Sequence, residues 1–202
     1  MKGVVKMQLQ TRQVGIFAAL VLMMMATRFY SHFGSSIYLP DASLAVFFLV
    51  GFYLARLALP AAAAFVLLLL VAGGVDYYAI AFRGVSDACI SPAYWFLIPT
   101  YACMWYAGRW LAVRQQMKWV NLGGLAAVAW GSITVAFLIS NTSYYLLSGN
   151  FADKNLAQYA GGIAAYYPEY LSCTMLYLTC ATVLHVLLVN LGKNTDHSAE
   201  RV

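Results

Sequence analysis

A cysteine, Cys89, stands in a short polar segment, VSDACISPAY (85–94), between two long apolar runs. Ser91 and Pro92, which follow it, are typical of the start of a helix. Backbone N–H groups at a helix start favour the thiolate form of a cysteine, whereas the neighbouring Asp87 opposes it. Thiolates are soft ligands for transition metals. Cys89 is therefore a candidate metal ligand, with a tolerated free thiol as the alternative.

The other three cysteines, Cys103, Cys173 and Cys180, lie in apolar sequence that predicts helix. Cysteine in such sequence behaves as a small buried hydrophobic residue, and we expect that role here. The four cysteines form no CxxC pair and no metal-ligand spacing, which leaves a disulfide framework or a zinc site unsupported.

Two charged residues interrupt apolar runs: Asp76 in GGVDYYAIAF and Arg28 in MMMATRFYSHF. Ionisable groups inside a membrane are costly and usually face a cavity or a partner. Arg28 is a candidate counter-ion for Asp76, and Arg83 is another. Such a pair either lines a ligand site or only locks helices together. His32, one turn beyond Arg28, is either a surface residue or a further ligand contact.

The elements that position these residues follow from the composition. The chain has 202 residues, of which 63% are hydrophobic and 9% charged, and a mean hydropathy of +0.73. Soluble domains are about 25% charged, so this chain is expected to be an all-α integral membrane protein with one domain over 1–202. The apolar runs predict six transmembrane helices, over about 13–33, 41–58, 61–82, 92–112, 119–140 and 168–191.

Lysine and arginine fall unevenly on the two sides of these helices. Nine lie on the side of the termini, at Lys2, Lys6, Arg12, Arg56, Arg109, Arg114, Lys118, Lys193 and Arg201; Arg28, Arg83 and Lys154 lie on the other. This predicts that both termini are cytoplasmic. The net charge of +5 then reflects topology, and no nucleic-acid partner is needed to explain it.

Tyrosines favour the predicted outer face, where Cys89 also falls. Eleven lie at or near it: Tyr30, Tyr38, Tyr77, Tyr78, Tyr94, Tyr144, Tyr145, Tyr159, Tyr166, Tyr167 and Tyr170. An aromatic belt anchors helices at both interfaces, whereas an outer cavity walled by hydroxyl-bearing rings explains a one-sided bias. Both interpretations stay open. The long connection over 141–167 contains a predicted short helix, over 154–165, that would lie as a lid.

Two segments, MMATRFYSHFGSSIYLPDASLAVFFLVGFYL (24–54) and VDYYAIAFRGVSDACISPAYWFLIPTYACMWYAGRWLA (75–112), resemble the BtuM family. These bacterial inner-membrane proteins transport cobalamin and are related to the substrate-binding S components of energy-coupling-factor importers. The likeness covers roughly residues 12–112, and its most specific part is the core DACISPAY.

The resemblance implies an S-component-like bundle with an outward-open pocket for cobalamin. In that pocket Cys89 would ligate the cobalt, and Tyr94 and Asp76 would line the corrin site. Further expected contacts are Tyr78, Asp87, Arg28, His32 and Asp41.

The sequence departs from the pattern of these S components in one feature, which concerns the energy source. S components that dock on a shared energising module commonly carry an AxxxA surface in their first helix. Here the nearest equivalent is Gly15 with Ala19, which puts a coupling module in doubt and favours a solitary transporter. The sequence contains no nucleotide-binding P-loop.

A thiolate bound to cobalt would weaken the bond to cyanide on the opposite face of cyanocobalamin, so Cys89 is also a candidate for removing that ligand. Two other functions stay open: a membrane thiol oxidoreductase in which Cys89 exchanges with a partner, and an S component for a different vitamin.

Overall fold

The computed structural model describes residues 2–32, 40–55, 58–85, 91–114, 122–149, 151 and 155–199, and the side chains within 11–29, 40–55, 62–85, 91–114, 122–149, 151 and 155–190. Within these ranges every regular element is a helix. The predicted all-α class is therefore confirmed for the described part of the chain.

Four of the described helices are long and apolar enough to cross a membrane. They are α1 (Lys2–His32), α3 (Ala58–Arg83), α5 (Leu122–Leu147) and α7 (Tyr167–Ala199). Large apolar side chains cover their outer faces, among them Leu70 and Leu187. A chain with such surfaces needs lipid around it, which supports a membrane protein.

The predicted helix over 41–58 is shorter than expected. It forms α2 (Ser43–Tyr53), whose 11 residues span only about 16 Å, about half the hydrocarbon thickness of a bilayer. Eight of these residues are buried. The run is apolar because protein surrounds it, and composition does not distinguish a helix buried in protein from one exposed to lipid.

Two glycines let α2 pack closely against α4 (Leu97–Arg114). A Cβ at Gly51 would overlap the carbonyl oxygen of Trp105, and a Cβ at Gly108 would overlap that of Phe48. Only glycine permits such a close approach of two helix backbones. The contact buries Phe47 and Met104 completely in the core.

Other boundaries also differ from the predictions. Helix α1 begins at Lys2 and not at about 13, α5 ends at Leu147 and not at about 140, and α7 ends at Ala199 and not at about 191. The predicted helix over 92–112 begins as a 3₁₀-helix, η1 (Pro92–Phe96), and continues as α4. Helix α3 begins at Ala58, so Pro60 lies in its first turn and not between two helices. Proline is tolerated there because the first-turn N–H groups have no partner within the helix.

The predicted long connection over 141–167 is partly helical. Helix α5 continues to Leu147, and α6 (Leu156–Ala164) confirms the predicted short helix. Asn155 caps α6, since its side chain accepts from the Gln158 N–H at 2.9 Å and Gln158 reaches back to the Asn155 N–H. The Tyr159 hydroxyl donates to the Asn141 carbonyl of α5 at 2.6 Å, which fixes α6 against α5. Its predicted role as a lid stays a prediction.

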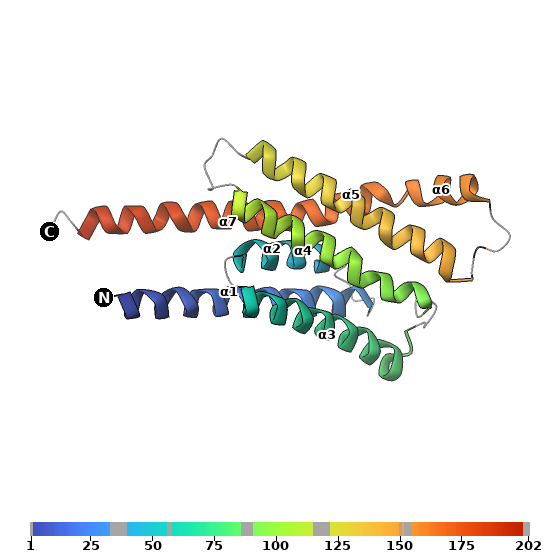
Figure 1. The fold of residues 1–202 in the computed structure, drawn as a ribbon, viewed down its shortest axis with the longest axis horizontal. Helices are drawn as coiled ribbons and strands as arrows, with labels where there is room; N and C mark the ends of the chain where they lie inside the picture. The colour runs from blue at the N-terminus through green and yellow to red at the C-terminus, as the bar shows by residue number, and fades with distance from the viewer. Residues whose placement is uncertain are drawn as a thin grey trace.

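From α1 to α5 the helices run alternately in opposite directions, and α6 and α7 follow one another back toward the C-terminus (Figure 1). The start of α1, the end of α4 and the end of α7 lie at one end of the molecule, which we call the terminal end. The last residues of α1, α3 and α5 and the first of α7 lie at the other, which we call the far end. The described basic residues toward this end are those that the charge pattern grouped together: Lys2, Lys6, Arg12, Arg109, Arg114 and Lys193. That this end is cytoplasmic stays a prediction.

Candidate binding site

Arg28 and Asp76 form a buried ion pair between α1 and α3. The guanidinium donates from Nε to Oδ1 of Asp76 at 2.7 Å and from Nη2 to Oδ2 at 2.6 Å. The side chains are 8% and 10% exposed. Parallel bonds of this kind are the strongest geometry that an arginine and a carboxylate can adopt. Of the two counter-ions proposed for Asp76, Arg28 is the one that these bonds confirm.

The third nitrogen of the same guanidinium joins this pair to α2 and α4. Arg28 Nη1 lies 3.1 Å from Oδ2 of Asp41, 3.0 Å from the Ser43 hydroxyl and 3.0 Å from the Tyr101 hydroxyl. Asp41 in turn accepts from the Ser43 N–H at 2.9 Å, in the first turn of α2. One arginine therefore connects four helical elements at the far end of the bundle.

Tyr94 extends this network to η1. Its hydroxyl donates to Oδ2 of Asp76 at 2.7 Å. The Ser91 hydroxyl accepts from the Ala93 N–H at 3.3 Å and caps η1, as the Ser-Pro pair predicted. Tyr94 follows Cys89 by five positions in the sequence. The segment after Cys89 is thus anchored to the Arg28–Asp76 pair.

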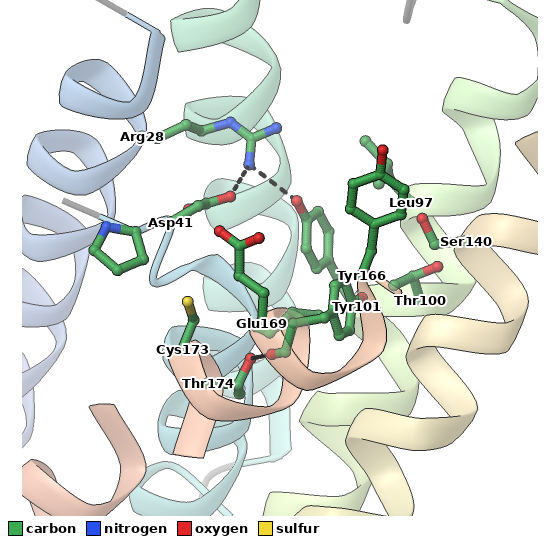
Figure 2. Close-up of a pocket in the computed structure, with 13 residues that line it drawn as sticks. Arg28, Asp41, Leu97, Thr100, Tyr101, Ser140, Tyr166, Glu169, Cys173 and Thr174 are labelled. Carbon is green, nitrogen blue, oxygen red and sulfur yellow. Dashed lines mark hydrogen bonds and ion pairs between the residues drawn. The ribbon is translucent and has the colours of Figure 1, made fainter. Parts of the chain in front are cut away.

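A cavity of about 410 Å³ lies beside this network at the far end (Figure 2). This volume is within the range of small-molecule sites. Its walls come from α1, from α2 and the segment before it, from α4 and α5, and from α7 and the turn before it. The lining residues are Arg28, Pro40, Asp41, Leu44, Leu97, Thr100, Tyr101, Ser140, Tyr166, Glu169, Tyr170, Cys173 and Thr174.

Hydroxyl groups and carboxylates give the cavity its chemistry. Six lining residues carry hydroxyls, on Tyr101, Tyr166, Tyr170, Thr100, Ser140 and Thr174. Figure 2 shows the Glu169 side chain extending from α7 toward the space beside Asp41 and Arg28. Hydroxyls donate and accept, and carboxylates accept, so the walls suit a ligand with both kinds of polar group.

The predicted site residues fall into three groups. Arg28 and Asp41 line the cavity. Asp76 accepts from Arg28 and Tyr94 donates to Asp76, but neither is among the lining residues. Tyr78 lies apart, with its ring 6.3 Å from that of Phe29 and 5.5 Å from that of Phe82.

The remaining predicted residues are Cys89, Asp87 and His32. Cys89 and Asp87 lie outside the described residues. His32 is the last residue of α1, and its side chain is outside the described part of the chain. Their roles stay predictions.

The described cysteines are free thiols, but the expectation that they are buried is wrong. Cys180 is exposed, Cys103 and Cys173 are partly exposed, and Cys173 lines the cavity. Sequence periodicity in α7 did not separate Cys173 from Cys180, because apolar residues surround both.

Sequence reasoning missed several cavity residues on α4, α5 and α7. Thr100, Ser140 and Thr174 each sit in apolar helical sequence, and the hydroxyls of Thr100 and Thr174 bond to the carbonyls four residues earlier, which hides their polarity. Glu169 was not among the predicted site residues. The available signal was the cluster of three tyrosines around it, at 166, 167 and 170.

A second polar contact lies toward the terminal end. The Tyr53 hydroxyl of α2 is 3.2 Å from Nδ1 of His185 on α7, and the two rings are 5.9 Å apart. This contact holds the last turn of α2 against α7.

Comparison with models of protein families gives no match, and comparison with curated protein sequences gives none either.

Proposed function

We propose that this chain is a solitary transporter of the bacterial inner membrane that binds cobalamin in the far-end cavity. The observation that carries the proposal is a cavity with both hydroxyl and carboxylate groups, enclosed by apolar helices at the end opposite the termini. If the termini are cytoplasmic, as the basic residues predict, this cavity opens outward. A polar outward-facing cavity in a membrane bundle is what capture of a polar nutrient requires.

Cobalamin suits these walls because its corrin ring offers an apolar face and the rim of that ring carries carboxamides. Tyr101, Tyr166 and Tyr170 offer aromatic faces with hydroxyls, and Asp41 and Glu169 accept from amide N–H groups. Cobalamin is larger than the cavity, so the walls would enclose one edge of it and the remainder would lie at the mouth.

Cys89 would supply the cobalt ligand. The corrin already holds the metal, so one protein thiolate completes the site, and binding would drive the thiol to release its proton. In cyanocobalamin the cobalt–sulfur bond would replace the bond to the ligand on that face of the cobalt. Cyanide on the opposite face would then leave with its electron pair, and water would take its place. No oxidant or reductant is consumed in this exchange.

The direct test is the visible spectrum of cyanocobalamin mixed with purified protein in detergent. Wild type is expected to shift the spectrum toward that of a thiolate complex, and Cys89→Ala to lose the shift. Cys173→Ala is the matched control, since it removes a thiol from the cavity wall and should keep the shift. A Cys89→Ala protein with unchanged spectrum and affinity would contradict the proposal.

The thiol oxidoreductase is the second candidate, and the position of Cys173 is the observation that favours it. A second thiol lines the far-end cavity, at the end of the bundle where Tyr94 of η1 bonds to Asp76. Mass spectrometry without reductant decides the point, because a disulfide that contains Cys89 would favour thiol exchange. An S component for another vitamin would instead co-purify with a different ligand.

Docking on an energising module is not part of the proposal. Gly15 and Ala19 lie on an exposed stretch of α1, and two small residues do not define a partner. Uptake in cells that lack such modules would test the solitary assignment.

A further inference from the structure

Asp41 and Glu169 place two carboxylates on different walls of the far-end cavity. Asp41 precedes α2 and its side chain is 39% exposed. Glu169 is an exposed residue in the first turn of α7, and Figure 2 shows its carboxylate beside Asp41 and Arg28. Carboxylates accept hydrogen bonds and repel anions.

Arg28 carries the only positive charge among the described residues that line the cavity. Its three nitrogens already donate to Asp76, to Asp41 and to two hydroxyls, and its side chain is 8% exposed. An anionic ligand would have to displace one of these carboxylates to reach the guanidinium. Arg28 therefore organises the wall and offers no ready anion site.

Among the described residues of the network and the cavity, one carries a positive charge, Arg28, and three carry a negative charge, Asp76, Asp41 and Glu169. Like charges repel more strongly in a partly dehydrated cavity than in water. A negatively charged ligand is thus disfavoured, while a ligand that brings N–H donors gains bonds to Asp41 and Glu169.

We propose that Asp41 and Glu169 make this cavity selective for neutral or cationic ligands that donate hydrogen bonds. The inference rests on the proposed function for the place of the ligand and deepens it by naming what the site rejects. For cobalamin, conversion of one peripheral carboxamide to a carboxylate replaces two N–H donors with a negative charge, and binding should weaken.

Cys173 provides a probe of the cavity that does not depend on cobalamin. In a protein that keeps only this cysteine, with Cys89, Cys103 and Cys180 changed to serine, a cationic and an anionic methanethiosulfonate reagent are compared. Each transfers its thioalkyl group to the thiolate, and methanesulfinate leaves. Both rates are normalised to the rates with a small thiol in solution.

The cationic reagent is expected to react about tenfold faster than the anionic one after normalisation. Glu169→Gln keeps the shape and removes the charge, so it should reduce this ratio several-fold, and salt should reduce it as well. Asp196→Asn is the matched control. It removes the same charge about 40 Å further along α7 and should leave the ratio unchanged.

Equal rates for the two reagents, a ratio that Glu169→Gln leaves unchanged, or no reaction with either reagent would overturn the inference. A merely structural role of Glu169 would change both rates together and keep their ratio.

A second experiment, with cobalamin itself, separates this inference from the proposed function. Wild type is titrated with cyanocobalamin and with its derivative that has one carboxamide hydrolysed. If neither compound binds while the two methanethiosulfonate reagents still react with Cys173 at different rates, cobalamin is rejected as the ligand and the charge selection stands. Equal binding of both derivatives would reject the charge selection and keep cobalamin.

Discussion

The Tyr94 hydroxyl donates a 2.7 Å hydrogen bond to the carboxylate of Asp76, which in turn holds Arg28 at the cavity wall. This relationship joins the segment that follows Cys89 to the far-end cavity through three side chains. A change at one of these positions should therefore affect both the stability of the bundle and the geometry of the candidate site.

Asp76→Asn is expected to lower the free energy of unfolding by about 3 kcal/mol, because it leaves the buried Arg28 charge poorly compensated. Tyr94→Phe removes one neutral donor and should lower it by about 1 kcal/mol. Both are measured by unfolding in mixed detergent micelles. The double variant should be less destabilised than the sum of the two, since the residues share a bond. Strict additivity would show that the bond contributes nothing.

Arg28→Lys tests whether geometry matters beyond charge. An ammonium group keeps the positive charge but cannot donate in parallel to both oxygens of Asp76 while it reaches Asp41 and Tyr101. We expect a clear loss of thermal stability in detergent, together with weaker cyanocobalamin binding. The matched control is Arg83→Lys, at the end of α3 and exposed. Equal stability of the two variants would argue that only the charge of Arg28 is needed.

Gly108→Ala and Gly51→Ala test the close approach of α2 and α4. The added methyl group would overlap a backbone carbonyl in each case, so the helices must separate, and overpacking of this kind lowers stability by about 1–3 kcal/mol. Gly131→Ala in α5 is the control, because a Cβ there meets no atom within 4 Å. Alanine favours helix over glycine, so this control should keep or raise the unfolding temperature. Similar losses for all three would contradict the packing argument.

Asn155→Ala should loosen α6 without unfolding the bundle. It removes the cap of a nine-residue helix, and caps contribute about 1 kcal/mol. Hydrogen exchange of the amides in 156–164 should accelerate, while exchange in α5 stays as in wild type. Asn155→Asp, which also caps helices well, should keep the protection. Faster exchange throughout the chain would show that α6 supports the whole fold.

The sequence predicted the charged part of the site better than its walls. Asp76 and Arg28 stood out because ionisable residues in apolar runs need a partner, and pairing them required only that α1 and α3 be neighbours. The cavity walls were harder. Thr100 and Thr174 bond to their own helices, so neither residue breaks an apolar pattern.

The existence of the long helices was predictable from hydropathy. The runs that became α1, α3, α5 and α7 are long and apolar enough to cross a bilayer. Ser43–Tyr53 is also apolar, but because it is buried within the protein. Hydropathy alone does not distinguish contact with protein from contact with lipid. Gly51 and Gly108 were visible in the sequence, but their partner carbonyls depend on the pairing of α2 with α4.

The short, enclosed α2 has a consequence for how the protein is made. Synthesis runs from the N-terminus, so Ser43–Tyr53 leaves the ribosome before α4, which carries Gly108 and Trp105 against it. An 11-residue helix cannot hold itself across the bilayer in the interval. Its final placement must therefore wait for α4, and assembly of this membrane domain is completed after translation of its first three helices.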